Sequence, residues 1–295
     1  MTRAIAVGVD GSAESLAAAD WAAGEAALRG APLRIVHAWH LESADATVAQ
    51  DREEQARAAD AVLREAETRV SGRRPDLRVS AEVVGDAPVA ALLREAGRAE
   101  MLVLGSRGHG AVVGFLLGSY GQQVIAEAER PVVSVRAGTG TGAEVPGAGD
   151  SAGEIVVGQH GEPEDGAAVL RFAFEAAAAR GAAVRAVRAW TLPPLYAYNT
   201  GVLDMADQAG GLEPMERQAL ARAVAPWRER FPDVPVTEHV EIGSAGQVLL
   251  AASADARLLV VGRRAHRSPI GTRIGSVAHA ALHHANCPVA VVPPA

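Results

Sequence analysis

Lysine is absent from the chain, so all 28 basic residues are arginine. A phosphate-binding loop of the G-x-x-x-x-G-K-[ST] type requires its lysine, and the sequence therefore excludes that class of nucleotide-binding protein. Cysteine is almost absent as well. With Cys287 as its single cysteine, the chain cannot form an internal disulfide bond, which is consistent with a reducing compartment. We expect Cys287 to be a buried, apolar residue.

Long apolar runs are also missing. No stretch approaches the roughly 20 apolar residues of a membrane span, and the apolar run at the start is too short for a signal peptide. We therefore expect a cytoplasmic protein with no membrane span. The net charge is -7, whereas a nucleic-acid-binding protein needs a basic face, so we do not expect nucleic acid as a partner. Aromatic residues make up only 4%, so the core must be built from Ala, Val, Leu and Ile.

The most informative feature that is present is an internal repeat. Three segments recur in the same order: AIAVGVDG at 4–11 as EIVVGQHG at 154–161, MLVLG at 101–105 as LLVVG at 258–262, and PVVSV at 131–135 as PVAVV at 288–292. Such a series indicates a duplication. Between the copies lies a stretch rich in Gly, Ala and Thr, which is typical of a flexible linker. We predict domains at 1–137 and 153–295, joined by a linker at 138–152.

Within the first copy, strand and helix signals alternate. Strands are expected at 5–9, 33–39, 79–84, 101–104 and 132–135, and helices at 12–29, 47–70, from 86 onward and at 118–129. Ser12 is the expected cap of the first helix. Continuously apolar strands indicate a parallel sheet that is buried on both faces. The pattern predicts an α/β fold with two tandem doubly wound domains, each a five-stranded parallel sheet ordered 3-2-1-4-5 and flanked by helices.

Ligands of such sheets bind beyond the carboxyl ends of the strands, where the strand order reverses, here between strands 1 and 4. Asp10 follows strand 1, and the segment GSRGHGAVVGFLLGS at 105–119 follows strand 4 with the spacing G-x2-G-x9-G-S. Glycine allows a backbone to approach a ligand closely, and a helix N-terminus offers free N–H groups to an anion. We predict a nucleotide site in which Asp10 accepts from a ribose hydroxyl or helps to hold Mg²⁺.

These motifs resemble those of the universal stress protein family in its tandem, ATP-binding form. The resemblance implies ATP, with Mg²⁺, as the ligand, and a homodimer that pairs through the fifth strands. It also implies that the backbone at Ala38 contacts adenine. The family motif maps onto Asp10, Gly105, Gly108, Gly118 and Ser119. With the neighbouring residues of both loops, including Arg107 and His109, which could add charge, the full predicted ATP-binding set is Val9, Asp10, Gly11, Ser12, Ala38, Gly105, Arg107, Gly108, His109, Gly118 and Ser119.

The second copy departs from this pattern. His160 replaces Asp10, and Ala265 replaces Gly108. Its loop also carries four arginines, at 263, 264, 267 and 273. Two interpretations stay open: the second copy is a degenerate partner of the first, or it binds a different anion. The residues of that second anion site would be Gly262, Arg263, Arg264, Gly275 and Ser276.

The sequence favours an ATP-binding regulator of the stress response, whose protein partner it does not identify. A slow ATPase or phosphoryl-transfer enzyme and a ligand-free interaction scaffold are the alternatives. Only Asp10 and His109 could serve as general bases, and no lysine is present to stabilise a transferring phosphoryl group, so no catalytic residue is assigned. His279 and His283 stand at i, i+4 spacing, which we interpret as a surface helix end rather than a metal site.

Overall fold

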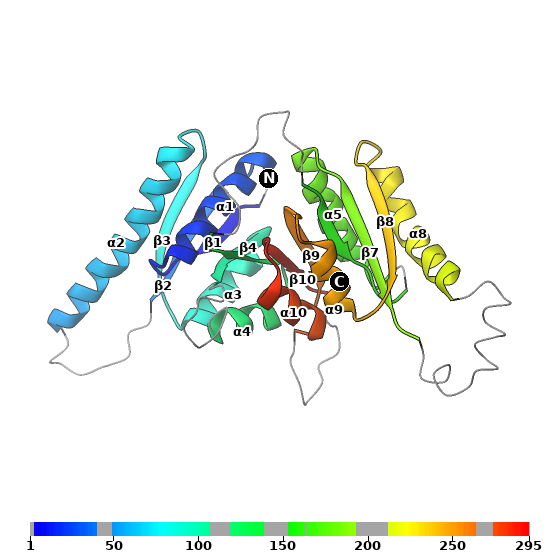
Figure 1. Ribbon diagram of the computed structural model, residues 1–295. Helices are drawn as coiled ribbons and strands as arrows, with labels where there is room; N and C mark the ends of the chain where they lie inside the picture. Colours follow the sequence, from blue (N-terminus) through cyan, green and yellow to red (C-terminus); the bar gives the residue numbers. More distant parts are fainter. Residues whose placement is uncertain are drawn as a thin grey trace. The chain divides into compact units, whose positions relative to one another are not determined.

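The computed structural model describes residues 3–39, 49–106, 119–138, 153–162, 164–192, 212–263 and 274–294. The chain divides into two compact units, residues 1–149 and 150–295, which we call domain 1 and domain 2. Each domain is an α/β unit in which helices flank a parallel sheet (Figure 1). The predicted linker at 138–152 lies almost entirely outside the described residues.

Domain 1 has the strand order β3-β2-β1-β4-β5, and all of its neighbouring strands are parallel. In this register Ile5 of β1 lies opposite Leu33 of β2 and Met101 of β4. The predicted order is therefore confirmed. The elements are β1 (Ile5–Gly8), α1 (Ala13–Arg29), β2 (Leu33–Trp39), α2 (Ala49–Arg73), β3 (Val79–Gly85), α3 (Pro88–Arg98), β4 (Met101–Ser106), α4 (Ser119–Glu127) and β5 (Val132–Arg136).

Domain 2 repeats this arrangement with the parallel order β8-β7-β6-β9-β10. Its elements are β6 (Ile155–Gly158), α5 (Ala167–Arg180), β7 (Val184–Trp190), α8 (Glu213–Arg230), β8 (Val236–Ile242), α9 (Ala245–Ala252), β9 (Leu258–Gly262), α10 (Ser276–His284) and β10 (Val289–Val292). Because the two sheets have the same order, each strand of domain 1 has a counterpart whose ends can be compared residue by residue.

The central strands are unbroken apolar runs because both of their faces are buried in the core. Ile5 and Val7 of β1 and Val103 of β4 are fully buried, since helices cover both faces of the sheet. The edge strand β3 instead alternates between half-buried and exposed positions. Alanines line the buried face of α1, so this helix lies close against the sheet.

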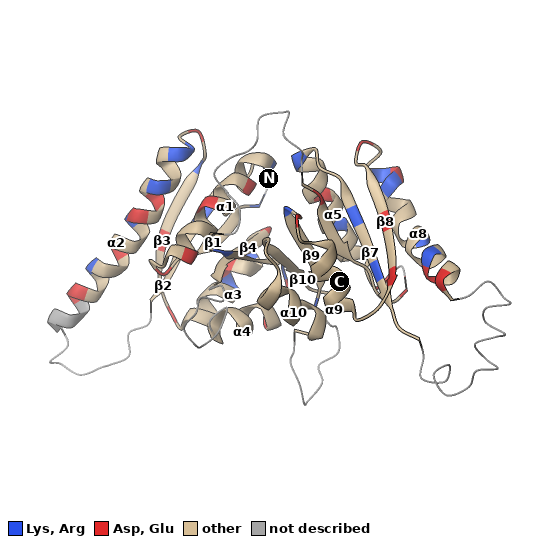
Figure 2. Cartoon of the chain, in the orientation of Figure 1, with Lys and Arg blue, Asp and Glu red and all other residues tan. Residues whose placement is uncertain are grey.

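Ion pairs tie the helices of domain 1 to the sheet and to each other. Asp20 of α1 accepts from Arg69 and Arg73 of α2, at 2.7 and 2.6 Å. The buried Glu95 of α3 accepts from Arg34 of β2 at 2.6 Å. Burial alone would lower the pKa of Arg34, but the two carboxylates that it contacts outweigh burial and raise that pKa. Figure 2 shows how densely charges of both signs cover α2 and α8.

In domain 2, aromatic packing takes the place of the ion pair between the first two helices. The ring of Phe174 in α5 lies 6.1 Å from that of Trp227, in the last turn of α8, and 5.8 Å from that of Phe231, the residue that caps this helix. The guanidinium of Arg230 lies 5.9 Å from the centroid of the Trp227 ring. Cys287 is buried, as predicted. Among the described helices, none is long and apolar enough to cross a membrane.

Candidate functional site

The loop between β1 and α1 holds Asp10 in one orientation. One carboxylate oxygen of Asp10, Oδ1, accepts from the backbone N–H of Ser12 at 3.0 Å and from its hydroxyl at 2.5 Å. The Ser12 hydroxyl in turn accepts from the N–H of Ser15, which confirms Ser12 as the helix cap. Gly11 makes the turn possible because its φ of 80° is strained for any side chain. An exposed carboxylate thus stands at the N-terminus of α1.

Gly105 at the end of β4 is required by packing. A Cβ placed there would lie 2.5 Å from the carbonyl carbon of Glu14 and 2.6 Å from the nitrogen of Ser15, both backbone atoms of α1. The φ angle of Gly105 is not positive, so close approach rather than backbone freedom demands glycine. Gly105 therefore brings the N-terminus of α1 against the carboxyl end of β4, the strand next to the one that Asp10 follows.

His37 of β2 joins the ends of two strands. Its ring nitrogen Nδ1 lies 2.7 Å from the carbonyl oxygen of Val9, and the N–H of Val9 donates to the carbonyl of Val36 at 2.9 Å. Val9 is buried, whereas Ala38 is half-buried and stands one residue beyond His37. The predicted residues Val9 and Ala38 thus lie at the carboxyl ends of adjacent strands, on the same edge of the sheet as Asp10.

The structure brings together only part of the predicted ATP site. Asp10, Gly11, Ser12 and Gly105 lie at the carboxyl ends of β1 and β4, which are adjacent strands. Ser119 is the first residue of α4, and the N-terminus of a helix can bind an anion through its free N–H groups. Four predicted residues lie outside the described part of the chain: Arg107, Gly108, His109 and Gly118.

The corresponding loop of domain 2 is held by a residue that sequence reasoning missed. Arg188 of β7 donates through Nη1 to the side-chain oxygen of Gln159 at 2.5 Å and to the carbonyl of Gly161 at 2.9 Å. Its Nε donates to Glu216 of α8 at 2.5 Å. Aligning LRIVHAW with VRAVRAW, which sets His37 against Arg188, is the signal that would have found it.

Three exposed carboxylates follow His160 in this loop: Glu162, Glu164 and Asp165. The comparison of the two glycine loops did not include them. Asp165 accepts from the N–H of Glu162 at 3.2 Å and so closes the turn at Gly161, whose φ is 77°. The described part of the loop after β6 is therefore acidic, although the arginines of the glycine loop predict a positive site.

The remaining residues of the predicted second anion site follow the strand ends. Gly262 ends β9, and the N–H of Arg263 donates to the carbonyl of Val292 at 2.8 Å. Gly275, with a φ of 89°, precedes Ser276 at the start of α10. Arg264 lies outside the described residues, together with Ala265, Arg267 and Arg273.

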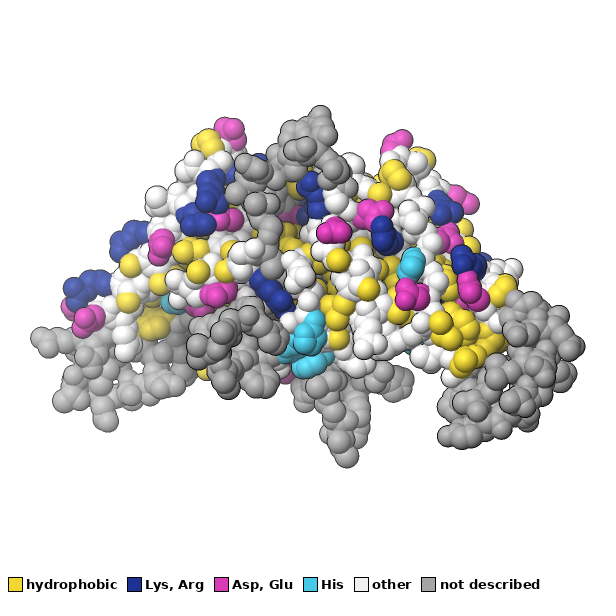
Figure 3. Space-filling model, viewed as in Figure 1, with side chains coloured by type: hydrophobic (Ala, Val, Ile, Leu, Met, Phe, Trp, Pro, Cys, Tyr) yellow, Lys and Arg dark blue, Asp and Glu magenta, His cyan; other side chains and the backbone are white. Residues whose placement is uncertain are grey.

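A histidine cluster occupies the surface of α10. The rings of His279 and His283 lie 4.0 Å apart, and those of His283 and His284 lie 6.2 Å apart. Figure 3 shows histidine side chains gathered over this helix. Within the described ranges, no group of three or more His, Cys, Asp or Glu residues is placed to hold a metal ion.

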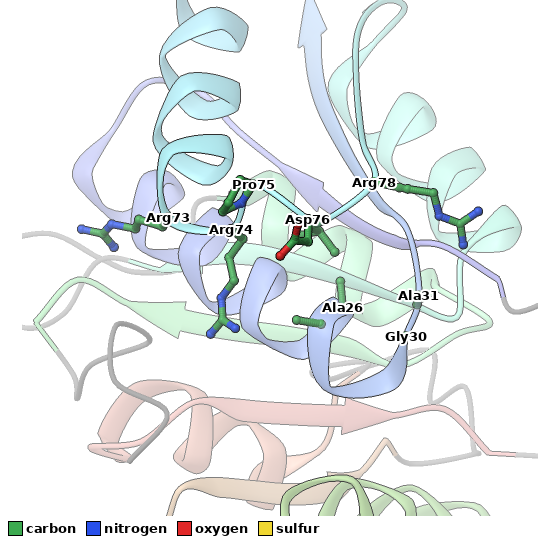
Figure 4. A pocket seen from close by; sticks show the side chains of 10 residues that line it. Ala26, Gly30, Ala31, Arg73, Arg74, Pro75, Asp76 and Arg78 are labelled. Atoms are coloured by element: carbon green, nitrogen blue, oxygen red, sulfur yellow. The ribbon is translucent and has the colours of Figure 1, made fainter. Parts of the chain in front are cut away.

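A hollow of about 470 Å³ lies at the opposite edge of the domain 1 sheet, before β2 and β3. Arg73, Arg74 and Arg78 line it together with Gly30 and Asp76. Figure 4 shows that the three guanidinium groups point away from one another, and Arg73 pairs with Asp20. Diverging cations do not form an anion site, so we assign no ligand to this hollow.

Comparison with known proteins gives consistent matches over the whole chain. A model described as the universal stress protein family matches residues 1–136 and again residues 153–293. A universal stress protein of Mycobacterium tuberculosis is 34% identical over 297 residues, which cover 97% of this chain and 96% of that protein. One of Mycolicibacterium smegmatis is 33% identical over 301 residues, covering 98% and 97%. The crystal structure of a universal stress protein from Archaeoglobus fulgidus is alike in fold, with a TM-score of 0.69, 16% identity and 98% coverage of both chains.

The packing at Gly105 generates a prediction with a matched control in domain 2. Gly105→Ala should destabilise the protein by about 2–3 kcal/mol, because the added methyl meets helix backbone that cannot rotate away. At Gly262, the corresponding position, the nearest atom is the side-chain Cγ2 of Val169 at 3.1 Å. Gly262→Ala should therefore change stability by less than about 1 kcal/mol. Urea unfolding measures both; equal losses would show that Gly105 has no special packing role.

Proposed function

Because the chain belongs to the universal stress protein family, we propose that domain 1 binds an adenine nucleotide, ATP with Mg²⁺, and that the protein is a nucleotide-dependent regulator in the stress response. The observation that carries this proposal is the oriented carboxylate of Asp10, held at the N-terminus of α1 by Ser12 and brought beside the end of β4 by Gly105. It stands at the point where the strand order of domain 1 reverses, and ligands of doubly wound sheets bind there.

The two sides of this crevice suit different parts of a nucleotide. The carboxylate of Asp10 accepts hydrogen bonds and would bind ribose hydroxyls or the water shell of Mg²⁺. The Mg²⁺ ion, when bound, would neutralise the charge of the phosphates. Ser119 and the N-terminus of α4 supply donors for phosphate oxygens. The half-buried end of β2 at Ala38 offers backbone groups to the base. Among these described groups only the carboxylate of Asp10 could also accept a proton, so the set suits binding.

Two further parts of the proposal extend beyond the crevice. We place the protein in the cytoplasm, and we propose that it forms a homodimer through the fifth strand of each domain, β5 and β10.

Asp10→Asn keeps the shape of the side chain and the acceptor for Ser12 but removes the charge. It should weaken binding of ATP with Mg²⁺ by about tenfold or more, because hydrogen bonds to charged groups contribute about 1.5–3 kcal/mol. His160→Asn at the corresponding position of domain 2 is the control and should leave affinity unchanged. Isothermal titration with and without EDTA separates the two roles: a loss confined to Mg²⁺ conditions assigns Asp10 to the metal. Unchanged affinity in Asp10→Asn would contradict its place in the site.

Ser119→Ala should weaken ATP binding by about fivefold, since one neutral hydrogen bond contributes about 1 kcal/mol. Ser276→Ala removes the equivalent hydroxyl from α10 and should have no effect. The same titration measures both variants. A loss much larger than tenfold in Ser119→Ala would assign its hydroxyl to the metal or to catalysis rather than to simple binding.

The nucleotide that accompanies the purified protein distinguishes a regulator from the two alternatives. We expect heat-denatured protein to release ATP, identified by chromatography of the supernatant. Release of ADP and phosphate would favour a slow ATPase instead. If neither the purified protein nor protein incubated with ATP retains nucleotide, a ligand-free scaffold is the better account.

A further inference from the structure

We propose that Arg188 takes the place of a ligand in domain 2. Its guanidinium holds the loop after β6 by hydrogen bonds, so this loop stays ordered when no nucleotide is bound. The proposal concerns domain 2 and holds whether or not domain 1 binds ATP as proposed above. It also decides between the two interpretations of the second copy, in favour of a domain that does not bind a nucleotide in this crevice.

The first reason is the reach of the Arg188 side chain. In domain 1 the ring nitrogen Nδ1 of the corresponding His37 reaches the carbonyl of Val9, and the loop beyond is held by its own hydroxyl and carboxylate groups. In domain 2 the longer side chain extends two residues further along the loop, to the carbonyl of Gly161. The guanidinium therefore reaches the stretch of loop whose counterpart in domain 1 is Asp10 to Ser12.

The second reason is that the cation is already neutralised and enclosed. The side chain of Arg188 is only 15% exposed, and its Nε is paired with Glu216 at the start of α8. Its Nη1 contacts Gln159, which is itself buried and stands where domain 1 has the apolar Val9. The arginine thus links β7, α8 and the β6–α5 loop into one hydrogen-bonded unit, and a planar guanidinium with several donors suits such a junction.

The third reason is the charge on the surface of that unit. Three exposed carboxylates, those of Glu162, Glu164 and Asp165, border the loop that Arg188 holds. These negative charges would repel the phosphates of a nucleotide that bound within a Debye length, roughly 8–10 Å, of the loop. The first two residues of the loop also differ in kind from those of domain 1, since buried Gln159 and exposed His160 replace Val9 and Asp10.

Hydrogen–deuterium exchange of the full chain tests this assignment. Arg188→Gln should speed exchange in the segment 159–162 by about tenfold, because it loses the charged hydrogen bonds that fix the loop. The N–H groups of Gln159 and Glu162 are bonded in the wild type and report on this loss. Glu216→Gln should have a smaller effect in the same direction. Arg217→Gln is the matched control, since Arg217 lies on the same helix in an exposed pair with Glu213 and should leave the segment unchanged.

A measurement on the wild type keeps the proposal falsifiable even if Arg188→Gln does not fold. Millimolar ATP with Mg²⁺, or inorganic phosphate alone, should leave exchange at 159–162 unchanged. Slower exchange there with either anion would overturn the proposal and establish an anion site in domain 2, as would a normal exchange rate in Arg188→Gln. Failure of ATP to protect residues 9–15 in domain 1 would instead contradict the proposed function and leave the role of Arg188 intact.

Discussion

The contact between the N-terminus of α1 and the backbone of β4 at Gly105 is the constraint on which the site in domain 1 depends. Since no side chain fits between them, the first helix begins directly beside the end of β4. The cap at Ser12 and the carboxylate of Asp10 are fixed relative to that helix by hydrogen bonds within a few residues. Close packing therefore fixes the position of the Asp10–Ser12 turn relative to the end of β4.

The two domains use the same sheet but stabilise the loop after the first strand by different means. Domain 1 relies on short-range bonds within the loop, where the side chain of Asp10 is exposed at the sheet edge. Domain 2 relies on Arg188, which connects the loop to β7 and α8. A loop ordered from within does not need a ligand to order it. In our account domain 1 binds the nucleotide, while domain 2 supplies a structure that does not depend on it.

Much of the fold could be predicted because the signals are local. Unbroken apolar runs predicted buried parallel strands, and a serine before an alanine-rich stretch predicted the cap at Ser12. The packing role of Gly105 could not be predicted, because it depends on a helix some ninety residues earlier in the chain. The exchange of His37 for Arg188 is visible in the sequence. Its consequence depends on Glu216 and Gln159, which only the folded sheet brings within reach of one guanidinium.

The number of nucleotides bound by each chain tests the central claim most directly. Native mass spectrometry of the full chain with increasing ATP and Mg²⁺ should show one nucleotide per chain at saturation, and that occupancy should fall in Asp10→Asn but not in His160→Asn. Saturation at two nucleotides per chain, or equal occupancy in both variants, would contradict an account in which domain 1 alone binds.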